Sequence, residues 1–460
     1  MSSTQQQINI KEMIEKDRPQ WLKDYYQFLS FPSISSEPEF KKPLLDCADW
    51  LMDYLKKLKF NVELWQTSGH PTIFASNLEA GPNKPTLLIY NHYDVQPVDP
   101  LELWESEPFK PTEKNGQVYA RGAQDNKGQC FYVIQALKYL IQQDGKLPIN
   151  IKLCIEGEEE VGSHGLSGIL KERKKELKAD YLAIVDLGIK DMQSPALTLG
   201  IRGILTMDVE IIGSKTDLHS GTHGGIAKNP IHAMVELLAT LRDNNGKIMI
   251  PGFYDEVKEL SEEEKRDVTF HFDQKEYQDS TGIESVGGEK QFTPYERAWT
   301  RPTIEINGIN GGYWGQGFKT VIPAKATAKI SCRLVPDQEP AHIAKLVAEH
   351  LRKNSPAGVT INVQIRPGSG KAVRIKPTAK VVKAFAEAYQ EVFNKPCEYI
   401  LAGGSIPVVT ELAEACGGEV LLMGLGLDSD QIHAPNEHFG IDRIEKGIQI
   451  MMKGIKKLEG

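Results

Sequence analysis

The sequence predicts an α/β protein in which a smaller α+β module interrupts a larger domain. Two observations lead to this expectation. Apolar runs alternate with helical patterns over the first 195 residues and again after Pro377, which is typical of the α/β class. A different order of strands and helices fills the stretch between them. The 460 residues are enough for two or three domains, so we expect a discontinuous domain with a mixed sheet, 1–199 and 372–460, and an inserted domain, 200–371.

We expect two helices and three buried strands in the first segment. Leu51, Leu55 and Leu58 share a face of the helix predicted near 46–58. Near-continuous apolar runs are typical of strands that are buried on both faces of a sheet. Such runs occur at 85–90, 150–155 and 181–185. A further helix is predicted over 131–142.

The inserted segment follows the order βαββαβ, which predicts a ferredoxin-like module. Its expected elements are a strand at 206–212, a helix at 229–242, strands at 303–309 and 327–334, a helix at 339–352 and a strand at 359–365. A long charged stretch, 251–301, separates the first helix from the second strand, and we expect it to form a solvated helix and loop. After the insertion, a helix at 381–392 and an apolar run at 420–423 resume the α/β pattern.

Composition argues against several classes of partner. Lys and Arg number 54 against 62 Asp and Glu, a net charge of −8, and there is no basic block, so we expect no nucleic-acid partner. No run reaches the roughly 18 apolar residues of a spanning helix, so we expect no membrane role. Residues 1–21 are polar and lack the apolar stretch of a secretory signal, and the six cysteines are scattered without a C-x-x-C pair. These features favour a cytoplasmic protein with reduced thiols.

Acidic and histidine residues gather where the predicted strands end. They are His92 and Asp94, Asp125, Glu156 and Glu158 to Glu160, Asp186, and His433. In an open α/β sheet the C-terminal ends of parallel strands converge on one crevice. Taken singly, each is ordinary: a surface His-x-Asp, a helix-capping Asp, a solvated acidic loop. Together, two histidines and three or four carboxylates suit Zn²⁺, Mn²⁺ or Co²⁺, and one bridging carboxylate would allow two metals.

Five segments occur in the order found in a known family. They are 92–97 (HYDVQP), 119–128 (YARGAQDNKG), 156–163 (EGEEEVGS), 217–221 (DLHSG) and 403–407 (GGSIP). On these motifs the chain resembles the di-metal aminoacylase/carboxypeptidase-family peptidases, and in particular their dipeptidase branch, which includes cytosolic non-specific dipeptidase and carnosinase. The resemblance extends from about residue 20 to the end. Ala120 stands where a glycine is usual, and Gln124 where a small hydroxyl residue is common, which affects the fine positioning of the Asp125 turn.

The resemblance implies a two-metal hydrolytic site. One metal would be held by His92, Asp125 and Asp186, and the second by Asp125, Glu160 and His433, with Asp125 bridging. Zn²⁺ is the first expectation, and Mn²⁺ and Co²⁺ suit the same ligands. The resemblance also implies a cis peptide bond between residues 125 and 126.

The resemblance further implies the roles of the residues beside the metals. Asp94 would orient His92. Glu159 would act as the general base that takes a proton from the bridging water and returns it to the leaving amine. The implied reaction is hydrolysis of short peptides, most simply dipeptides with a free C-terminal carboxylate.

In the inserted domain, the resemblance implies dimerisation and lid functions. His219 would reach into the partner subunit's active site and help to stabilise the oxyanion, so the functional unit would be a homodimer. Arg333 would bind the substrate's C-terminal carboxylate, for which a planar guanidinium is suited. Gly404 and Ser405 would line the same pocket, and Thr320 is a further substrate-binding candidate.

Two alternatives remain open from sequence. One is deacylation or desuccinylation of N-acyl amino acids, which is the same amide chemistry on another acyl group. The stretches 217–221 and 311–315 favour peptides over this alternative. The other is a catalytically silent homologue that binds peptides. The presence of Glu159 and of all five implied ligands argues against it, because a silent relative would be free to lose them.

Overall fold

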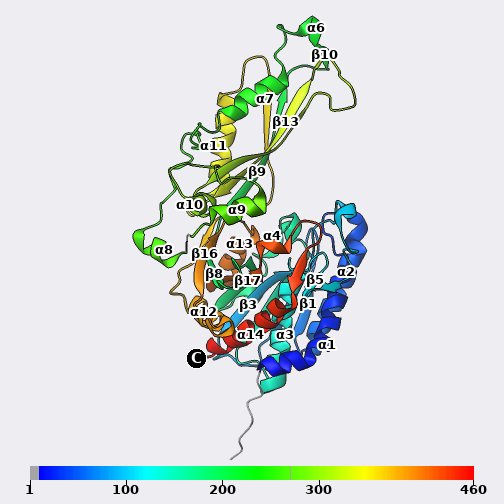
Figure 1. Cartoon of the computed structure of the whole chain (residues 1–460), viewed down its shortest axis with the longest axis vertical. Helices are drawn as coiled ribbons and strands as arrows, with labels where there is room; N and C mark the ends of the chain where they lie inside the picture. Colours follow the sequence, from blue (N-terminus) through cyan, green and yellow to red (C-terminus); the bar gives the residue numbers. More distant parts are fainter. Residues whose placement is uncertain (1–9, 270) are drawn as a thin grey trace, which may run out of the picture. The chain divides into compact units, whose positions relative to one another are not determined.

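The computed structural model describes residues 10–269 and 271–460, and the chain divides into two compact units (Figure 1). The first unit runs to Leu199 and resumes over Ile375–Ile400 and Glu411–Gly460. The second comprises Gly200–Arg374 and Leu401–Thr410.

The segment Leu401–Thr410 departs from the predicted division, which placed all of 372–460 in the larger domain. The physical reason is local hydrogen bonding to arginines of the second unit. The Arg202 amide donates to the Gly404 carbonyl (3.1 Å), and the Arg202 Nε donates to the Gly403 carbonyl (3.0 Å). Arg333 Nη1 donates to Ser405 Oγ (2.8 Å).

A nine-stranded mixed sheet forms the centre of the first unit, and its edge strand at 373–374 falls in the second unit by this division. In spatial order the strands are β1 (Asn61–Trp65), β2 (Thr72–Asn77), β6 (Asn150–Glu156), β3 (Thr86–His92), β7 (Tyr181–Gly188), β17 (Glu419–Gly426), β8 (Ala196–Ile201) and β15 (Val373–Arg374), with β16 (Glu398–Ala402) also paired to β8. The central strands β6, β3, β7 and β17 are parallel, and those toward both edges are antiparallel. The mixed α/β sheet predicted for this part of the chain is therefore confirmed.

The central strands are buried because their sequences are apolar on both faces. In β3 every residue from Leu87 to His92 is buried. The helices of this unit are α1 (Ile10–Leu29), α2 (Lys41–Lys57), α3 (Lys127–Asp144), α4 (His164–Ile169), α5 (Lys174–Leu177), α12 (Lys380–Phe393), α13 (Val408–Cys416, which begins in the second unit) and α14 (Ile441–Lys457). Helix α14 packs against both α3 and α12. This packing buries one layer of helices against the sheet and leaves the C-terminal strand ends for polar residues.

A small antiparallel sheet of the first unit joins distant parts of the chain. Its strands are β4 (Thr112–Lys114), β5 (Gln117–Tyr119) and β18 (His438–Gly440), and β5 is central. Tyr119 is paired with His438. This pairing sets the segment that follows β5 beside the segment that precedes β18.

The second unit contains a four-stranded antiparallel sheet in the order β11 (Thr303–Gly311), β13 (Lys325–Leu334), β9 (Gly203–Ile212) and β14 (Thr360–Ile365). Helices α7 (Pro230–Ala239) and α11 (Pro340–Lys353) complete the βαββαβ order predicted from sequence. Burial alternates along β9 and β13, and their buried residues join one core with both helices. Alternation of this kind is typical of a sheet with one covered face.

The charged stretch 251–301 forms three short helices, α8 (Glu262–Asp267), α9 (Gln274–Thr281) and α10 (Pro294–Trp299). Most of its described residues are exposed, as predicted. One feature was not predicted: Arg301 and Glu289 form a buried bidentate ion pair, with Nε–Oε2 and Nη2–Oε1 distances of 2.7 and 3.0 Å. This ion pair anchors the end of the stretch.

Two further expectations concern cysteines and membranes. All six cysteines are free thiols, and five of them are buried. Of the helices in the described ranges, none combines the length and the apolar character that a membrane crossing requires.

Candidate metal centre

Five side chains from separate loops and strands meet at the C-terminal ends of the parallel strands of the first unit. His92 ends β3, and Asp186 lies in β7 next to it. Glu160 lies in a short 3₁₀ turn that follows β6. Asp125 follows β5, and His433 lies in the loop before β18. The arrangement follows from the parallel order β6, β3, β7, which directs these strand ends to one edge.

The five side chains form two groups that share Asp125. His92, Asp125 and Asp186 make one group, and Asp125, Glu160 and His433 the other, with candidate ligand atoms within 4.8 Å of one another in each. Asp125 Oδ1 lies 3.1 Å from His92 Nε2, and Asp125 Oδ2 lies 2.9 Å from His433 Nε2. The two oxygens of one carboxylate therefore face different histidines.

The remaining ligand distances are similar. His92 Nε2 lies 3.6 Å from Asp186 Oδ1, and His433 Nε2 lies 3.2 Å from Glu160 Oε2. Burial, aided by the negative charge of Asp125, raises the pKa of Glu160 to about 7 and also raises the pKa of Asp186. Hydrogen bonds to Asp125 and Glu160 raise the pKa of His433 to about 11. Carboxylates crowded in this way repel one another unless cations neutralise them, so this set of oxygen and imidazole donors fits divalent metal ions.

Asp94, which was predicted to orient His92, contacts His92 and also the turn that carries Glu159 and Glu160. His92 Nδ1 lies 3.1 Å from the backbone carbonyl of Asp94 and 3.3 Å from its carboxylate. The carboxylate itself accepts the amides of Glu159 (3.2 Å) and Glu160 (3.1 Å). Asp94 therefore contacts a candidate ligand and also holds the turn that carries Glu159 and Glu160.

Glu159 lies in this turn beside the clustered carboxylates. Burial raises the pKa of Glu159 well above its usual range; the charge of His92 opposes the shift, and the charge of Asp186 adds to it. A carboxyl group in such surroundings is suited to receive a proton.

Two amide side chains near the ligands were missed by the sequence reasoning. Asn126 Nδ2 donates to Asp186 Oδ1 (2.5 Å), and the peptide bond between Asp125 and Asn126 is cis. Gln96 Nε2 donates to Glu160 Oε2 (2.8 Å). Asn126 directly follows the candidate ligand Asp125 in sequence, and this adjacency was an available signal, whereas Gln96 lies in the 92–97 motif next to no candidate ligand.

In the second unit, Arg333 and Ser405 are hydrogen-bonded, and Gly404 lies next to Arg202 as described above. Burial, together with the charge of Arg333, lowers the pKa of Arg202 to about 10. Across residues 10–269 and 271–460, neither arginine forms an ion pair with a carboxylate. Arg202 was not predicted. Two partly buried guanidinium groups without acidic partners make a favourable environment for an anion.

His219 and Thr320 lie together at another part of the second unit. The short strands β10 (Leu218–His219) and β12 (Val321–Ile322) are paired, and the Ser220 amide donates to the Thr320 carbonyl (3.1 Å). His219 is exposed, and its Nδ1 accepts the Gly221 amide (3.1 Å). The structure thus brings the two predicted residues together and leaves the imidazole of His219 accessible.

Comparisons with known proteins identify the family of the chain. The family model described as "Peptidase family M20/M25/M40" matches residues 88–457. The chain is 31% identical to the Cys-Gly metallodipeptidase dug1 of Schizosaccharomyces pombe, over 97% of each chain. It is also 33% identical to the Beta-Ala-His dipeptidase of Homo sapiens, over 88% of this chain and 83% of that protein.

A solved structure gives the same result. The M20 family metallo-carboxypeptidase Sso-CP2 of Sulfolobus solfataricus superimposes with a TM-score of 0.86 at 34% identity, covering 95% of this chain and 99% of that one. The match to the family model extends through both units and includes all five candidate ligands. The chain therefore belongs to peptidase family M20/M25/M40 and is a metallopeptidase.

Proposed function

We propose that this protein hydrolyses dipeptides with a free C-terminal carboxylate at a site that holds two divalent metal ions. Metal-dependent hydrolysis of dipeptides agrees with the dipeptidase names of its relatives. The observation that carries the two-metal proposal is the position of Asp125, whose two oxygens face His92 and His433 separately. A carboxylate shared by two ligand groups can bridge two metal ions about 3.5 to 4 Å apart, which is the separation found in two-metal hydrolytic sites.

The proposed ligands are His92, Asp125 and Asp186 for one ion, and Asp125, Glu160 and His433 for the other. Bound divalent ions would lower the pKa of water to about 7 and polarise the peptide carbonyl. Zn²⁺ is the ion we propose, because histidine with carboxylate is a common zinc ligand set, and Mn²⁺ or Co²⁺ would fit the same donors.

The protein's own groups would move the proton. Glu159 takes the proton of the attacking water and passes it to the leaving amine. Its position depends on Asp94, whose carboxylate accepts the amides of Glu159 and Glu160. We therefore assign Asp94 as a positioning residue for the general base, in addition to its contact with His92.

We propose that Arg333 binds the substrate's C-terminal carboxylate, with Ser405, Gly404 and Thr320 also contributing to substrate binding. The lack of an acidic partner for Arg333 supports this role, because a half-buried guanidinium then gains most from an anionic ligand. Arg202 would act indirectly: it holds the Gly403–Ser405 turn by two hydrogen bonds and adds positive charge beside it.

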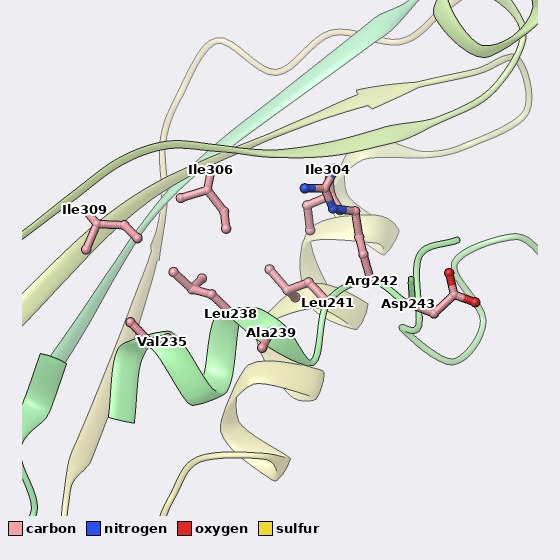
Figure 2. A pocket seen from close by; sticks show the side chains of 9 residues that line it. All are labelled: Val235, Leu238, Ala239, Leu241, Arg242, Asp243, Ile304, Ile306 and Ile309. Carbon is pink, nitrogen blue, oxygen red and sulfur yellow. The ribbon is translucent and has the colours of Figure 1, made fainter. Parts of the chain in front are cut away.

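We further propose that the second unit mediates a homodimer in which His219 acts in the partner's active site. The exposure of His219 supports this proposal. An exposed apolar surface at the β11 edge of the four-stranded sheet supports it as well. Apolar side chains of α7 and β11 line a groove of about 350 Å³. Figure 2 shows how these side chains face one another across the groove. Val235 and Ile309 are 55% and 47% exposed there. Strand β11 is an edge strand, and an exposed apolar edge is a site for pairing with another chain.

We also propose that the enzyme is cytoplasmic, because its free thiols suit a reducing compartment.

The decisive experiment uses protein stripped with a chelator and refilled separately with Zn²⁺, Mn²⁺ or Co²⁺. Amino-acid release is measured from dipeptides, tripeptides and N-acetyl amino acids. We expect metal-restored cleavage of dipeptides and no cleavage of the acyl compounds. Preference for tripeptides would indicate a peptidase acting on longer chains, and cleavage of only the acyl compounds would indicate a deacylase.

Glu159→Gln tests the general base with the same substrates. We expect turnover to be abolished while two metal ions per chain remain bound, because Glu159 belongs to neither ligand group. Substantial turnover by this variant would show that another residue is the base.

A further inference from the structure

We propose that Glu437 is a positioning residue for the metal centre: its buried carboxylate fixes the backbone that carries Asp125 and ties it to the loop that carries His433. This inference rests on the proposed two-metal site. Glu437 itself belongs to neither candidate ligand group.

The Glu437 carboxylate accepts four hydrogen bonds from one short segment. Its Oε2 accepts from Arg121 Nη1 (2.9 Å) and from the Gly122 amide (2.8 Å). Its Oε1 accepts from the amides of Gln124 (2.9 Å) and Asp125 (3.0 Å). Glu437 is 1% exposed. Both oxygens are thus fully committed to the turn that ends at the shared ligand.

These contacts join two segments that are remote in sequence. The pairing of β5 with β18 aligns them, and the Ala120 amide donates to the Glu437 carbonyl (3.1 Å). Beyond Ala120 the hydrogen bonds between the two strands end. The amides of Gly122, Gln124 and Asp125 donate to the side chain of Glu437 instead. His433 lies four residues before Glu437 in the same loop. One carboxylate therefore fixes the approach of Asp125 to His433.

The local backbone is adapted to these contacts. Gly122 has a φ of +84°, and a Cβ there would lie 2.7 Å from Val95 Cγ1. Only glycine fits this position without strain, and its amide is one of the four donors. Arg121 compensates the buried charge of Glu437 and also donates from Nη2 to the Pro97 carbonyl (2.9 Å).

A carboxylate is required because each oxygen faces two donors. Glutamine has the same shape, but its amide nitrogen would face two N–H groups instead of accepting from them. Glu437→Gln should therefore release one half of the turn and displace Asp125. Since Asp125 belongs to both groups, we expect the affinity for both metal ions to fall at least tenfold, the lower end of what loss of an outer contact to a metal ligand costs.

The experiment titrates Co²⁺ into chelator-stripped protein and follows its visible absorption, with bound metal counted by atomic spectroscopy. The variants are Glu437→Gln, Glu437→Asp and a matched control, Glu289→Gln, which breaks a buried carboxylate–arginine pair in the second unit. Thermal unfolding of each metal-free protein is measured alongside. We expect weaker Co²⁺ binding at both sites in Glu437→Gln, partial recovery in Glu437→Asp, and unchanged affinity in the control.

Each outcome decides the proposal. Wild-type affinity at both sites in a folded Glu437→Gln would overturn it. An equal loss of affinity in Glu289→Gln would also overturn it, because general destabilisation would then explain the effect. If Glu437→Gln fails to fold, Glu437→Asp carries the test, and wild-type affinity in that variant counts against the proposal. Wild-type protein that binds no Co²⁺ would instead refute the two-metal site itself, and the inference with it.

Discussion

Replacing Asp94 by asparagine should separate its two contacts. The side chain is fully buried, and its two oxygens accept the amides of Glu159 and Glu160. Asparagine keeps one acceptor oxygen and presents an amide nitrogen to the other N–H group. His92 keeps its hydrogen bond, because the backbone carbonyl of residue 94 is the closer acceptor. We therefore expect the turn that carries Glu159 to be displaced while His92 stays in place.

The magnitude follows from the bond that is lost. A hydrogen bond to a charged acceptor contributes about 1.5 to 3 kcal/mol. If this is expressed in the position of Glu159, kcat should fall about 10- to 100-fold, since each 1.4 kcal/mol corresponds to a factor of ten. Metal content should stay near two ions per chain, because Asp94 is not a proposed ligand.

The assay is steady-state hydrolysis of a dipeptide, with bound metal measured on the same Asp94→Asn samples. Glu156→Gln is a matched control, because Glu156 is also fully buried at the end of a neighbouring strand and bonds to Tyr90 and Ser163 instead. We expect the kcat of this control to stay within about twofold of wild type. A kcat near wild type in Asp94→Asn would refute the role in holding the turn. Loss of metal with unchanged kcat per bound ion would show that Asp94 acts through His92.

Three further predictions address other groups. Arg333→Met should raise KM about 100-fold for dipeptides and have little effect on dipeptide amides, which lack the carboxylate; equal effects on both substrates would contradict carboxylate binding. Burial raises the pKa of Glu156 to about 8, so this group holds its proton in the folded state, and its contribution to stability is lost as pH rises from about 5 to 8. The melting temperature of Glu156→Gln minus that of wild type should therefore increase over this pH range. A difference that does not change with pH would disprove the elevated pKa. Mixed subunits of His219→Ala and Glu159→Gln, each inactive alone, should regain partial activity, and no recovery despite proven subunit exchange would exclude action in trans.

The strand ends were predictable because their sequences combine two simple signals. Apolar runs such as 85–90 identify buried parallel strands, and the polar residue that follows each one must lie at the same edge of the sheet. His92 and Asp186 could be assigned in this way. The ferredoxin-like order was likewise readable from the spacing of apolar residues, since periods of two and about 3.6 distinguish strands from helices.

The contacts that hold the ligands were not predictable, because they join residues far apart in the chain. Glu437 lies 312 residues from Asp125, and Gln96 lies 64 residues from Glu160. Neither spacing carries a periodic signal. The same holds for the segment Leu401–Thr410, whose place in the second unit depends on hydrogen bonds to Arg202 and Arg333.

The candidate ligands are supported in two different ways. Asp186 and Glu160 each belong to one group and each receive a side-chain amide, from Asn126 and Gln96 respectively. Asp125 belongs to both groups, and its support reaches its backbone through Glu437. Fixing the backbone leaves both carboxylate oxygens of Asp125 free to face His92 and His433. Of the proposed ligands, Asp125 alone serves both groups, and the Glu437 contacts fix its backbone without adding a donor to either carboxylate oxygen, so both oxygens stay aligned with the two histidines.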